Sequence, residues 1–129
     1  MTVYEGSCLC GAVEFCYTAP SLWCAHCHCS LCRRAHGAGF VTWVGVDQDR
    51  FTLNRDSDLS WYSSSEDSER GFCRTCGSSL FFRSERWPQQ VHIALGNIHS
   101  PIDIEPAKHG CWDDHVSWLE CNDGLPRQP

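Results

Sequence analysis

The chain has 129 residues, eleven of them cysteine, and a formal net charge of −6 at pH 7. This length predicts a single domain, residues 1–129, without room for a second independent core. The odd number of cysteines and their tight grouping argue against a simple disulfide framework. The Lys and Arg residues form no basic stripe of the kind that binds nucleic acid, and no apolar run approaches the roughly 20 residues of a membrane span. We therefore expect neither a nucleic-acid partner nor a membrane.

The N-terminal residues indicate a cytoplasmic location. The segment MTVYEGSCLCG lacks the basic stretch and the apolar run of a signal peptide. In a reducing cytosol, clustered cysteines stay as thiols and favour metals over disulfides. We expect a cytoplasmic protein, although a mature secreted fragment would fit the same residues.

Strand signals dominate the chain and predict an all-β fold. Residues 12–18 alternate, with Val13, Phe15 and Tyr17 on one face, and residues 40–46 are continuously apolar, as in a strand buried on both faces. The pattern continues, with Gly, Pro, Asn and Asp between the runs, through residues 51–53, 59–63, 80–83 and 91–95. Several short strands of this kind favour antiparallel sheets in a sandwich or an open barrel.

Helix-period signals are nearly absent. One short helix is expected from Ser30 to His36, with Ser30 as its N-cap and Gly37 as its stop. Residues 63–69 are the one compositionally biased stretch and indicate a polar turn. The tail after residue 100 is expected to be irregular chain held by two aromatic anchors, Trp112 and Trp118.

The first cysteine group joins two distant parts of the chain: Cys8, Cys10, Cys73 and Cys76. The two residues between Cys73 and Cys76 are a zinc-knuckle spacing, which lets both sulfurs face one ion about 2.3 Å away. Gly77 supplies the permissive backbone that such a turn often needs. Four thiolates complete a closed tetrahedral shell, so we predict a structural zinc ion that contributes roughly 10–16 kcal/mol of apparent binding energy. The alternative is a set of buried thiols without a metal.

The second group places three thiols within six residues: Cys27, Cys29 and Cys32. Three protein ligands with a vacant fourth position are typical of a reactive zinc site. The alternative is a second structural site closed by a nearby histidine: His26, His28 or His36. Three thiolates leave zinc a weaker Lewis acid than three neutral histidines do. This ligand set disfavours activation of water and favours binding an incoming thiol and presenting it as a nucleophile.

The candidate catalytic residues stand beside the second group in the sequence. Arg33 and Arg34 follow it directly and could pair with the carboxylates of an anionic thiol, or be ordinary solvated arginines. We assign the holding of a carboxylate to Arg33 and the movement of a proton to His28 or His36. His92 lies on a predicted strand and could reach a pocket, although a core or surface histidine is the commoner outcome.

The remaining cysteines are expected to be small buried hydrophobic residues. They are Cys16, Cys24, Cys111 and Cys121.

Several segments together resemble the glutathione-dependent formaldehyde-activating enzyme family, also called the centromere protein V family. The resemblance runs in the expected order along nearly the whole chain. The matching segments are Gly6–Val13, Cys27–Arg33, Phe72–Ser78 and, in the tail, Pro106–His109, Trp118 and Asp123–Pro126.

The resemblance implies a β-tent fold of antiparallel sheets clamped by zinc, similar to methionine sulfoxide reductase B and to a small guanine-nucleotide exchange chaperone. It also implies a structural zinc at the first cysteine group and a more labile zinc at the second. Members are described as carbon–sulfur lyases, or as catalysts of adduct formation between glutathione and formaldehyde. The sequence departs from the family at residues 109–111, where His-Gly-Cys puts small residues in place of a larger hydrophobic one.

The leading hypothesis is a zinc-dependent carbon–sulfur lyase acting on a thiol–carbonyl adduct such as S-(hydroxymethyl)glutathione, with glutathione as its small-molecule partner. One alternative is a non-enzymatic zinc module that binds another protein, for which six tryptophans leave room. Another alternative is a thiol redox enzyme on the same fold, using Cys111 and Cys121.

Overall fold

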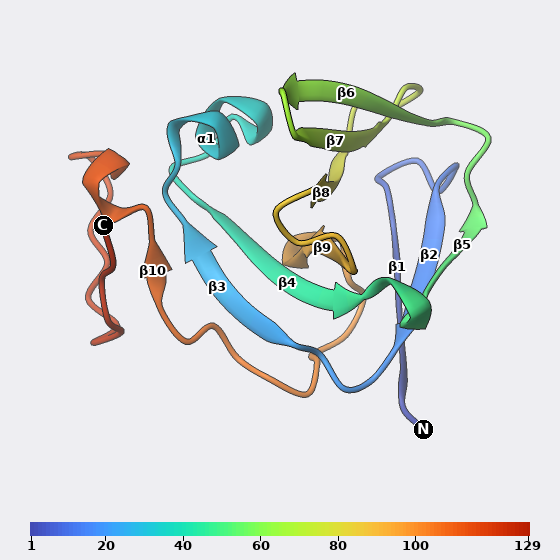
Figure 1. Cartoon of the computed structure of the whole chain (residues 1–129), viewed down its shortest axis with the longest axis horizontal. Coiled ribbons are helices and arrows are strands. Elements are labelled where there is room, and N and C mark those ends of the chain that lie inside the picture. The colour runs from blue at the N-terminus through green and yellow to red at the C-terminus, as the bar shows by residue number, and fades with distance from the viewer.

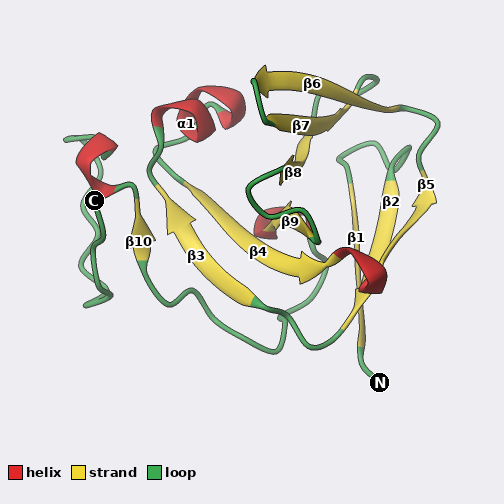
Figure 2. Ribbon diagram, viewed as in Figure 1, coloured by secondary structure: helices red, strands yellow, loops and turns green.

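A computed structural model describes all residues, 1–129, and shows a chain made mostly of strands (Figure 2). The strands are, in chain order, β1 (Val3–Ser7), β2 (Glu14–Thr18), β3 (Trp23–Cys27), β4 (Val41–Asp47), β5 (Phe51–Arg55), β6 (Leu59–Ser65), β7 (Ser68–Cys73), β8 (Ser79–Ser84), β9 (Gln90–Ala94) and β10 (His109–Gly110). The helices are α1 (Ser30–His36) and three 3₁₀ turns, η1 (Gln48–Arg50), η2 (Leu95–Asn97) and η3 (Trp112–Asp114). No helix has the length and apolar character needed to cross a bilayer.

The strands form two sheets. The smaller has the order β1-β2-β5, and the larger has the order β10-β3-β4-β9-β8-β7-β6. All pairs are antiparallel except β10, which lies parallel to β3. In Figure 1, β3 and β4 cross the molecule side by side, with the small sheet at one end and β10 and the C-terminal tail at the other. The prediction of an all-β fold of packed antiparallel sheets is confirmed.

The main core brings the inner face of the small sheet against the large one. Phe15 and Tyr17 of β2 are almost fully buried, together with Val44 of β4, Phe81 of β8 and Ile93 of β9. Phe15 meets Phe81 edge to face, with ring centroids 5.0 Å apart. Removal of these apolar side chains from water is the main force that holds the sheets together. The alternation seen in residues 12–18 therefore does mark the buried face of β2.

The α-helix has the predicted bounds but a different N-cap. Cys29 occupies the N-cap position and makes no side-chain capping bond, and Ser30 is the first helical residue. Ser30 as N-cap is therefore wrong, because Ser30 already has helical geometry and the cap falls one residue earlier, between two cysteines of the second group. Gly37 ends the helix in the left-handed region (φ 60°, ψ 39°), as expected of a glycine stop.

The polar turn predicted over residues 63–69 is shorter in the structure. Strand β6 continues to Ser65 and β7 begins at Ser68, so Glu66 and Asp67 alone connect them. The sequence also missed β1, β3 and β7, which are rich in Cys, His, Ser or charged residues. Their strand conformation depends on pairing with neighbours more than on intrinsic propensity.

The tail is irregular, as predicted, but only one of its two expected anchors is well packed. Trp112 is partly buried, stacks on His115 with centroids 4.1 Å apart, and carries the Arg127 guanidinium over its ring. Trp118 is 72% exposed, and the edge of its ring lies near Gly39. Trp118 as an anchor is therefore wrong, since most of its ring stays in water.

Gly6 marks the closest approach of the small sheet to the chain after β9. A Cβ on Gly6 would overlap the ring of Phe15 and lie 2.5 Å from the carbonyl oxygen of Asn97. Because the backbone at Asn97 cannot move freely, we expect Gly6→Ala to lower the free energy of unfolding by roughly 1–3 kcal/mol, measured by urea titration. Gly96→Ala is the control, since a Cβ there meets nothing within 4 Å. Equal stability of the two variants would contradict this packing.

Candidate functional site

The first cysteine group is assembled from the loop after β1 and the turn between β7 and β8. The sulfurs of Cys8, Cys10, Cys73 and Cys76 all lie within 4.8 Å of one another. Cys8 Sγ is 3.6 Å from Cys10 Sγ, and Cys10 Sγ is 3.8 Å from Cys73 Sγ. A tetrahedron with metal–sulfur bonds of about 2.3 Å has edges of about 3.8 Å, so this donor set fits one zinc ion.

Hydrogen bonds favour the thiolate form at two of the four sulfurs, those of Cys8 and Cys76, whereas the pKa of Cys10 is raised to about 12. The Ser78 hydroxyl, 3.2 Å from Cys76 Sγ, lowers the pKa of the Cys76 thiol to about 5, with help from backbone N–H groups. Burial raises the pKa of Cys8, but the hydrogen bond from the Val13 N–H, 3.2 Å from Cys8 Sγ, and those with the Cys10 and Cys73 thiols outweigh it, and the pKa is lowered. Thiolate ligands stabilised in this way are typical of structural zinc sites.

The position of the first group explains what a metal would do there. Cys8 and Cys10 follow β1 of the small sheet, whereas Cys73 and Cys76 lie at the end of β7 of the large sheet. Cys8 and Cys73 are also fully buried members of the main core. An ion bound by all four sulfurs would therefore cross-link the two sheets beside the core.

The second cysteine group lies where β3 ends and α1 begins. Cys27 Sγ is 3.6 Å from Cys32 Sγ, the separation expected of two ligands on one ion. Cys29 is not in a set of three sulfurs within 4.8 Å of one another, so its side chain must move closer to join the pair. The structure thus brings together two of the three predicted ligands and leaves the third nearby, at the start of the helix.

Cys111 is a neighbour of the second group that the sequence did not reveal. Gly110 pairs with Cys27 across the β10–β3 ladder, and the Gly110 carbonyl accepts the His28 N–H at 3.0 Å. Burial raises the pKa of the Cys111 thiol, the Cys29 thiol raises it further, and an interaction with the Cys27 thiol lowers it. No sequence spacing could indicate this approach, because it depends on the parallel pairing of β10 with β3.

Arg70 of β7 is a second residue that the sequence did not reveal. Its Nη1 and Nη2 atoms are each 3.6 Å from Cys32 Sγ, and its guanidinium lies over the Phe82 ring, 5.0 Å from the centroid. A hydrogen bond from Cys27 and then the positive charge of Arg70 overcome burial and lower the pKa of the Cys32 thiol to about 6. Arg70 therefore places positive charge on the cysteine pair from another strand.

Two of the histidines considered as a fourth ligand are engaged elsewhere. His26 Nδ1 is 2.7 Å from Thr42 Oγ1, and His36 packs edge-on against Trp43 with centroids 5.3 Å apart. Neither imidazole belongs to a cluster of donor atoms with the second cysteine group. The geometry does not favour a site closed by these histidines.

His28 belongs to a buried hydrogen-bonded chain that runs into the tail. His28 Nε2 is 2.8 Å from His109 Nδ1, and His109 Nε2 is 2.8 Å from Asp123 Oδ2. Both imidazoles are 1% exposed, and His28 Nδ1 has no partner. Donor atoms of His28, His109 and Cys121 also lie within 4.8 Å of one another. The tail therefore holds the loop of the second cysteine group from outside the sheet.

The candidate arginines, Arg33 and Arg34, lie outside the cavity that reaches the second cysteine group. Arg34 donates from Nε to the Ser30 carbonyl at 3.4 Å and is exposed, while Arg33 is partly buried, with its Nε unpaired. Neither lines the cavity that reaches Cys27 and Cys32.

That cavity opens on one face of β3, β4, β8 and β9 and has a volume of about 690 Å³. Cys27 and Cys32 form part of its wall, and His92 lies on the wall opposite the tail segment. Its remaining lining is mainly aromatic and aliphatic: Leu22, Trp23, Ala25, Trp43, Phe82, Trp87, Ile104 and Ala107. A thiol pair beside a mainly apolar cavity is a suitable place for chemistry on a small molecule.

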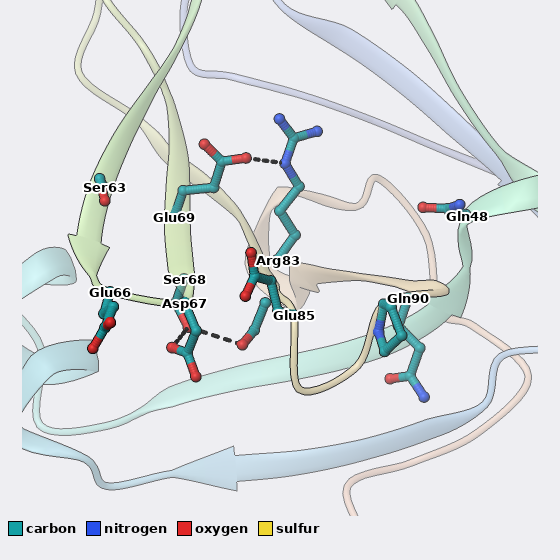
Figure 3. Close-up of a pocket in the computed structure, with 11 residues that line it drawn as sticks. Gln48, Ser63, Glu66, Asp67, Ser68, Glu69, Arg83, Glu85 and Gln90 are labelled. Atoms are coloured by element: carbon teal, nitrogen blue, oxygen red, sulfur yellow. Dashed lines mark hydrogen bonds and ion pairs between the residues drawn. The ribbon is translucent and has the colours of Figure 1, made fainter.

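A second hollow lies at the opposite end of β7 from Cys73 and has no apolar lining (Figure 3). Its charged side chains are largely paired: Arg83 binds Glu69, and Arg86 Nε lies 3.4 Å from Asp67 Oδ2. Ser68 donates to Ser84 at 2.9 Å across the strands. These contacts stabilise the β6–β7–β8 hairpins. We therefore assign the residues around this hollow a structural role.

Burial of His92 makes a pH-dependent contribution to stability. Burial, and then the charge of Arg86, lower the pKa of His92 from 6.5 to about 4. As the pH falls, His92 is therefore protonated in the unfolded chain before it is protonated in the folded one. Its contribution to the free energy of unfolding is fully present above pH 6.5 and is lost as the pH falls toward 4. From pH 7 to pH 5 this group alone should cost about 2 kcal/mol of unfolding free energy.

His92→Phe should remove that share of the acid sensitivity, because phenylalanine does not titrate and suits the aromatic surroundings. Urea unfolding of the wild type and of His92→Phe at pH 7 and pH 5 measures this share. Loss of thiolate coordination in acid affects both proteins equally and cancels in the comparison. His99→Phe, at an exposed position, is the control and should keep the wild-type difference. An unchanged pH difference in His92→Phe would rule out a neutral buried imidazole.

Fold and site together define a class: an all-β protein whose two sheets meet at a four-cysteine, metal-competent cluster, with a further thiol pair beside an apolar cavity. The chain belongs to the glutathione-dependent formaldehyde-activating enzyme family, whose family model matches residues 3–114.

Individual relatives agree with this family. A Halomonas elongata protein, provisionally named glutathione-dependent formaldehyde-activating enzyme, is 33% identical over 124 residues, covering 90% of this chain and 79% of its own length. An uncharacterized lyase of Schizosaccharomyces pombe is 33% identical over 84 residues, covering 64% of this chain and 58% of its own. The crystal structure of a Rhodobacter sphaeroides protein shares the fold, with a TM-score of 0.61, 20% identity and coverage of 97% of this chain and 99% of that one.

Proposed function

We propose that the protein is a zinc-dependent enzyme of the carbon–sulfur lyase type, acting on a thiol–carbonyl adduct such as S-(hydroxymethyl)glutathione. In the direction of synthesis, the thiol sulfur attacks the carbonyl carbon, a C–S bond forms, and the thiol proton passes to the carbonyl oxygen. The reverse direction breaks the C–S bond and returns the proton to sulfur. Membership of the family and the name of the fission-yeast relative support this class of reaction.

The observation that carries the proposal is the Cys27–Cys32 pair, 3.6 Å apart, on the wall of the cavity and in contact with Arg70. Zinc held by Cys27, Cys29 and Cys32 would supply a Lewis acid that lowers the pKa of the substrate thiol. The Arg70 guanidinium adds positive charge beside Cys32. The aromatic walls keep water from the adduct, which would otherwise break down in solution.

We assign the proton step to His28. His28 adjoins Cys27, and its chain through His109 to Asp123 reaches the exposed tail, so a proton can be exchanged with solvent. Neither His28 nor His36 lines the cavity. His36, the other candidate, packs against Trp43, so the hydrogen-bonded chain to the tail is what favours His28.

The carboxylate-holding role expected of Arg33 is better supported for Lys108. Lys108 lines the cavity, and its Nζ donates to Gln128 at 2.9 Å on the surface. Arg33 does not line the cavity.

A cytoplasmic location is part of the proposal, because all eleven cysteines are free thiols, which a reducing compartment maintains.

The redox alternative is less well supported. Cys121 groups with His28 and His109, whereas Cys111 approaches Cys27, so the structure does not pair the two cysteines with each other. A pure binding module would leave the cavity and its thiol pair without a role.

Exchange NMR on zinc-loaded protein with glutathione and formaldehyde tests the proposal. We expect interconversion of free and adduct glutathione at least tenfold faster than in buffer, and loss of that acceleration in Cys29→Ser. Cys16→Ser, a partly buried cysteine of β2 outside both groups, is the matched control and should retain it. No acceleration by fully loaded wild-type protein would defeat the formaldehyde reaction.

A further inference from the structure

The walls of the cavity beside Cys27 and Cys32 are aromatic. Phe82 and His92 are cross-strand partners whose rings stack at 5.6 Å, and Trp23 meets His92 edge-on at 4.7 Å. Trp87 lies 5.3 Å from His92, and Trp43 lies 6.1 Å from Phe82. Four strands of one sheet thus present a continuous aromatic surface that leads to the cysteine pair.

The rings are held in place before any ligand arrives. Gln90 Oε1 accepts hydrogen bonds from Trp23 Nε1 at 3.0 Å and from His92 Nε2 at 2.9 Å. The Trp23 indole lies across Gly45, where a Cβ would overlap it. Trp23 Nε1 and His92 Nε2 are therefore already paired, and the ring faces remain for contact with a ligand.

Charge is scarce in this cavity. Eleven of its sixteen lining residues are hydrophobic, and apart from the thiols of Cys27 and Cys32 only Glu105 and Lys108, both in the exposed segment before β10, carry a full charge. Glutathione brings two carboxylates and an ammonium group, each of which loses hydration on entering an apolar space. An aromatic ring would instead gain both apolar burial and ring–ring contacts.

We propose that the adduct processed at this site carries an aromatic ring close to its C–S bond, held between Trp23, Trp43, Phe82 and Trp87. This inference rests on the proposed thiol–carbonyl function and names its substrate class. The ring can belong to either half of the adduct, an arylalkyl thiol or an aromatic aldehyde. In both cases the sulfur attacks the carbonyl carbon and its proton passes to the oxygen, so no further reactant is needed.

Binding is tested first, without turnover, on full-length zinc-loaded protein. Benzyl methyl sulfide and S-methylglutathione, thioethers that cannot form adducts, are titrated by isothermal calorimetry. We expect the benzyl compound to bind at least tenfold more tightly. Equal or tighter binding of S-methylglutathione would overturn the proposal.

Trp87→Ala removes one wall at limited risk to folding, because Trp87 is 41% exposed and lies on the turn between β8 and β9. We expect it to weaken binding of the benzyl compound about tenfold. Trp118→Ala, outside the cavity and 72% exposed, is the control and should bind as wild type. Equal effects of the two variants would overturn the proposal.

Exchange NMR then shows whether the ring belongs to the thiol or to the aldehyde. It also tests the lyase function separately from the aromatic substrate class. Benzyl thiol with formaldehyde tests the thiol side, and glutathione with benzaldehyde tests the aldehyde side; either should exchange at least tenfold faster than glutathione with formaldehyde. Binding of the benzyl thioether without accelerated exchange of any pair would uphold the aromatic site and defeat the lyase function. Acceleration of glutathione with formaldehyde alone would uphold the lyase function and overturn the aromatic substrate class.

Discussion

Cys73→Ser is expected to leave most of the chain unfolded at room temperature. Cys73 is fully buried in the main core and is one of the four sulfurs of the first group. Loss of one ligand forfeits much of a metal-binding free energy of roughly 10–16 kcal/mol. The whole stability of a domain is typically about 5–15 kcal/mol, so little would remain. Circular dichroism and a thermal melt measure the loss, with metal content by elemental analysis on the same sample.

Cys16→Ser is the control for the loss of one thiol. Cys16 lies in β2, pairs with Glu5 of β1 and Thr52 of β5, and belongs to no metal-competent group. It should melt near the wild-type temperature and keep the wild-type metal content. If Cys73→Ser kept both, the clamp between the sheets would not depend on a metal.

Cys29→Ser is expected to reduce the bound zinc from two ions to one while the fold is retained. Cys29 lies at the N-cap of α1 in a loop at the edge of the large sheet, so the second group joins no two sheets. Cys29→Ser removes one of the three thiolates, so the site should lose its zinc. The core between the two sheets contains none of these residues and should stay intact. Elemental analysis gives the zinc count, and circular dichroism with a thermal melt reports the fold.

The same experiment on Cys111→Ser examines the neighbour that β10 brings to the second group. If the second site is formed by Cys27, Cys29 and Cys32, this variant should retain both ions. An unchanged count of two in Cys29→Ser, with loss of one ion in Cys111→Ser, would show that Cys111 replaces Cys29 as a ligand.

The two cysteine groups illustrate how far spacing can lead. The spacing of Cys8 and Cys10 and of Cys73 and Cys76 predicts two pairs of metal ligands. Together the four sulfurs can complete the tetrahedral coordination of one zinc ion. The structure places all four within 4.8 Å of one another. The local cluster of residues 27–32 was equally visible, but only Cys27 and Cys32 stand together in the folded chain. Spacing limits where sulfurs can point, and the helix start at Ser30 then sets the direction of the Cys29 side chain.

The surroundings of the second group were beyond the reach of the sequence. Arg70 reaches Cys32 only because β7 passes near α1, and Trp23 and Trp87 share a wall only because β3 and β9 flank β4. The place of His28 beside the cysteines was visible in the sequence, but its hydrogen bond to His109 of the tail was not. Each of these contacts joins residues far apart in the chain, and no local pattern encodes them.

By itself, the sequence determined the all-β character, the helix from Ser30 to His36, the four-cysteine cluster and the family. These features depend on hydrophobic period, turn residues and ligand spacing, which are local properties of a chain. Only the tertiary structure decided which thiols of the second group meet, which cation faces them and what lines the space in front of them. Those features depend on strand order and register, which arise when the whole core closes and distant side chains reach the same face of one sheet.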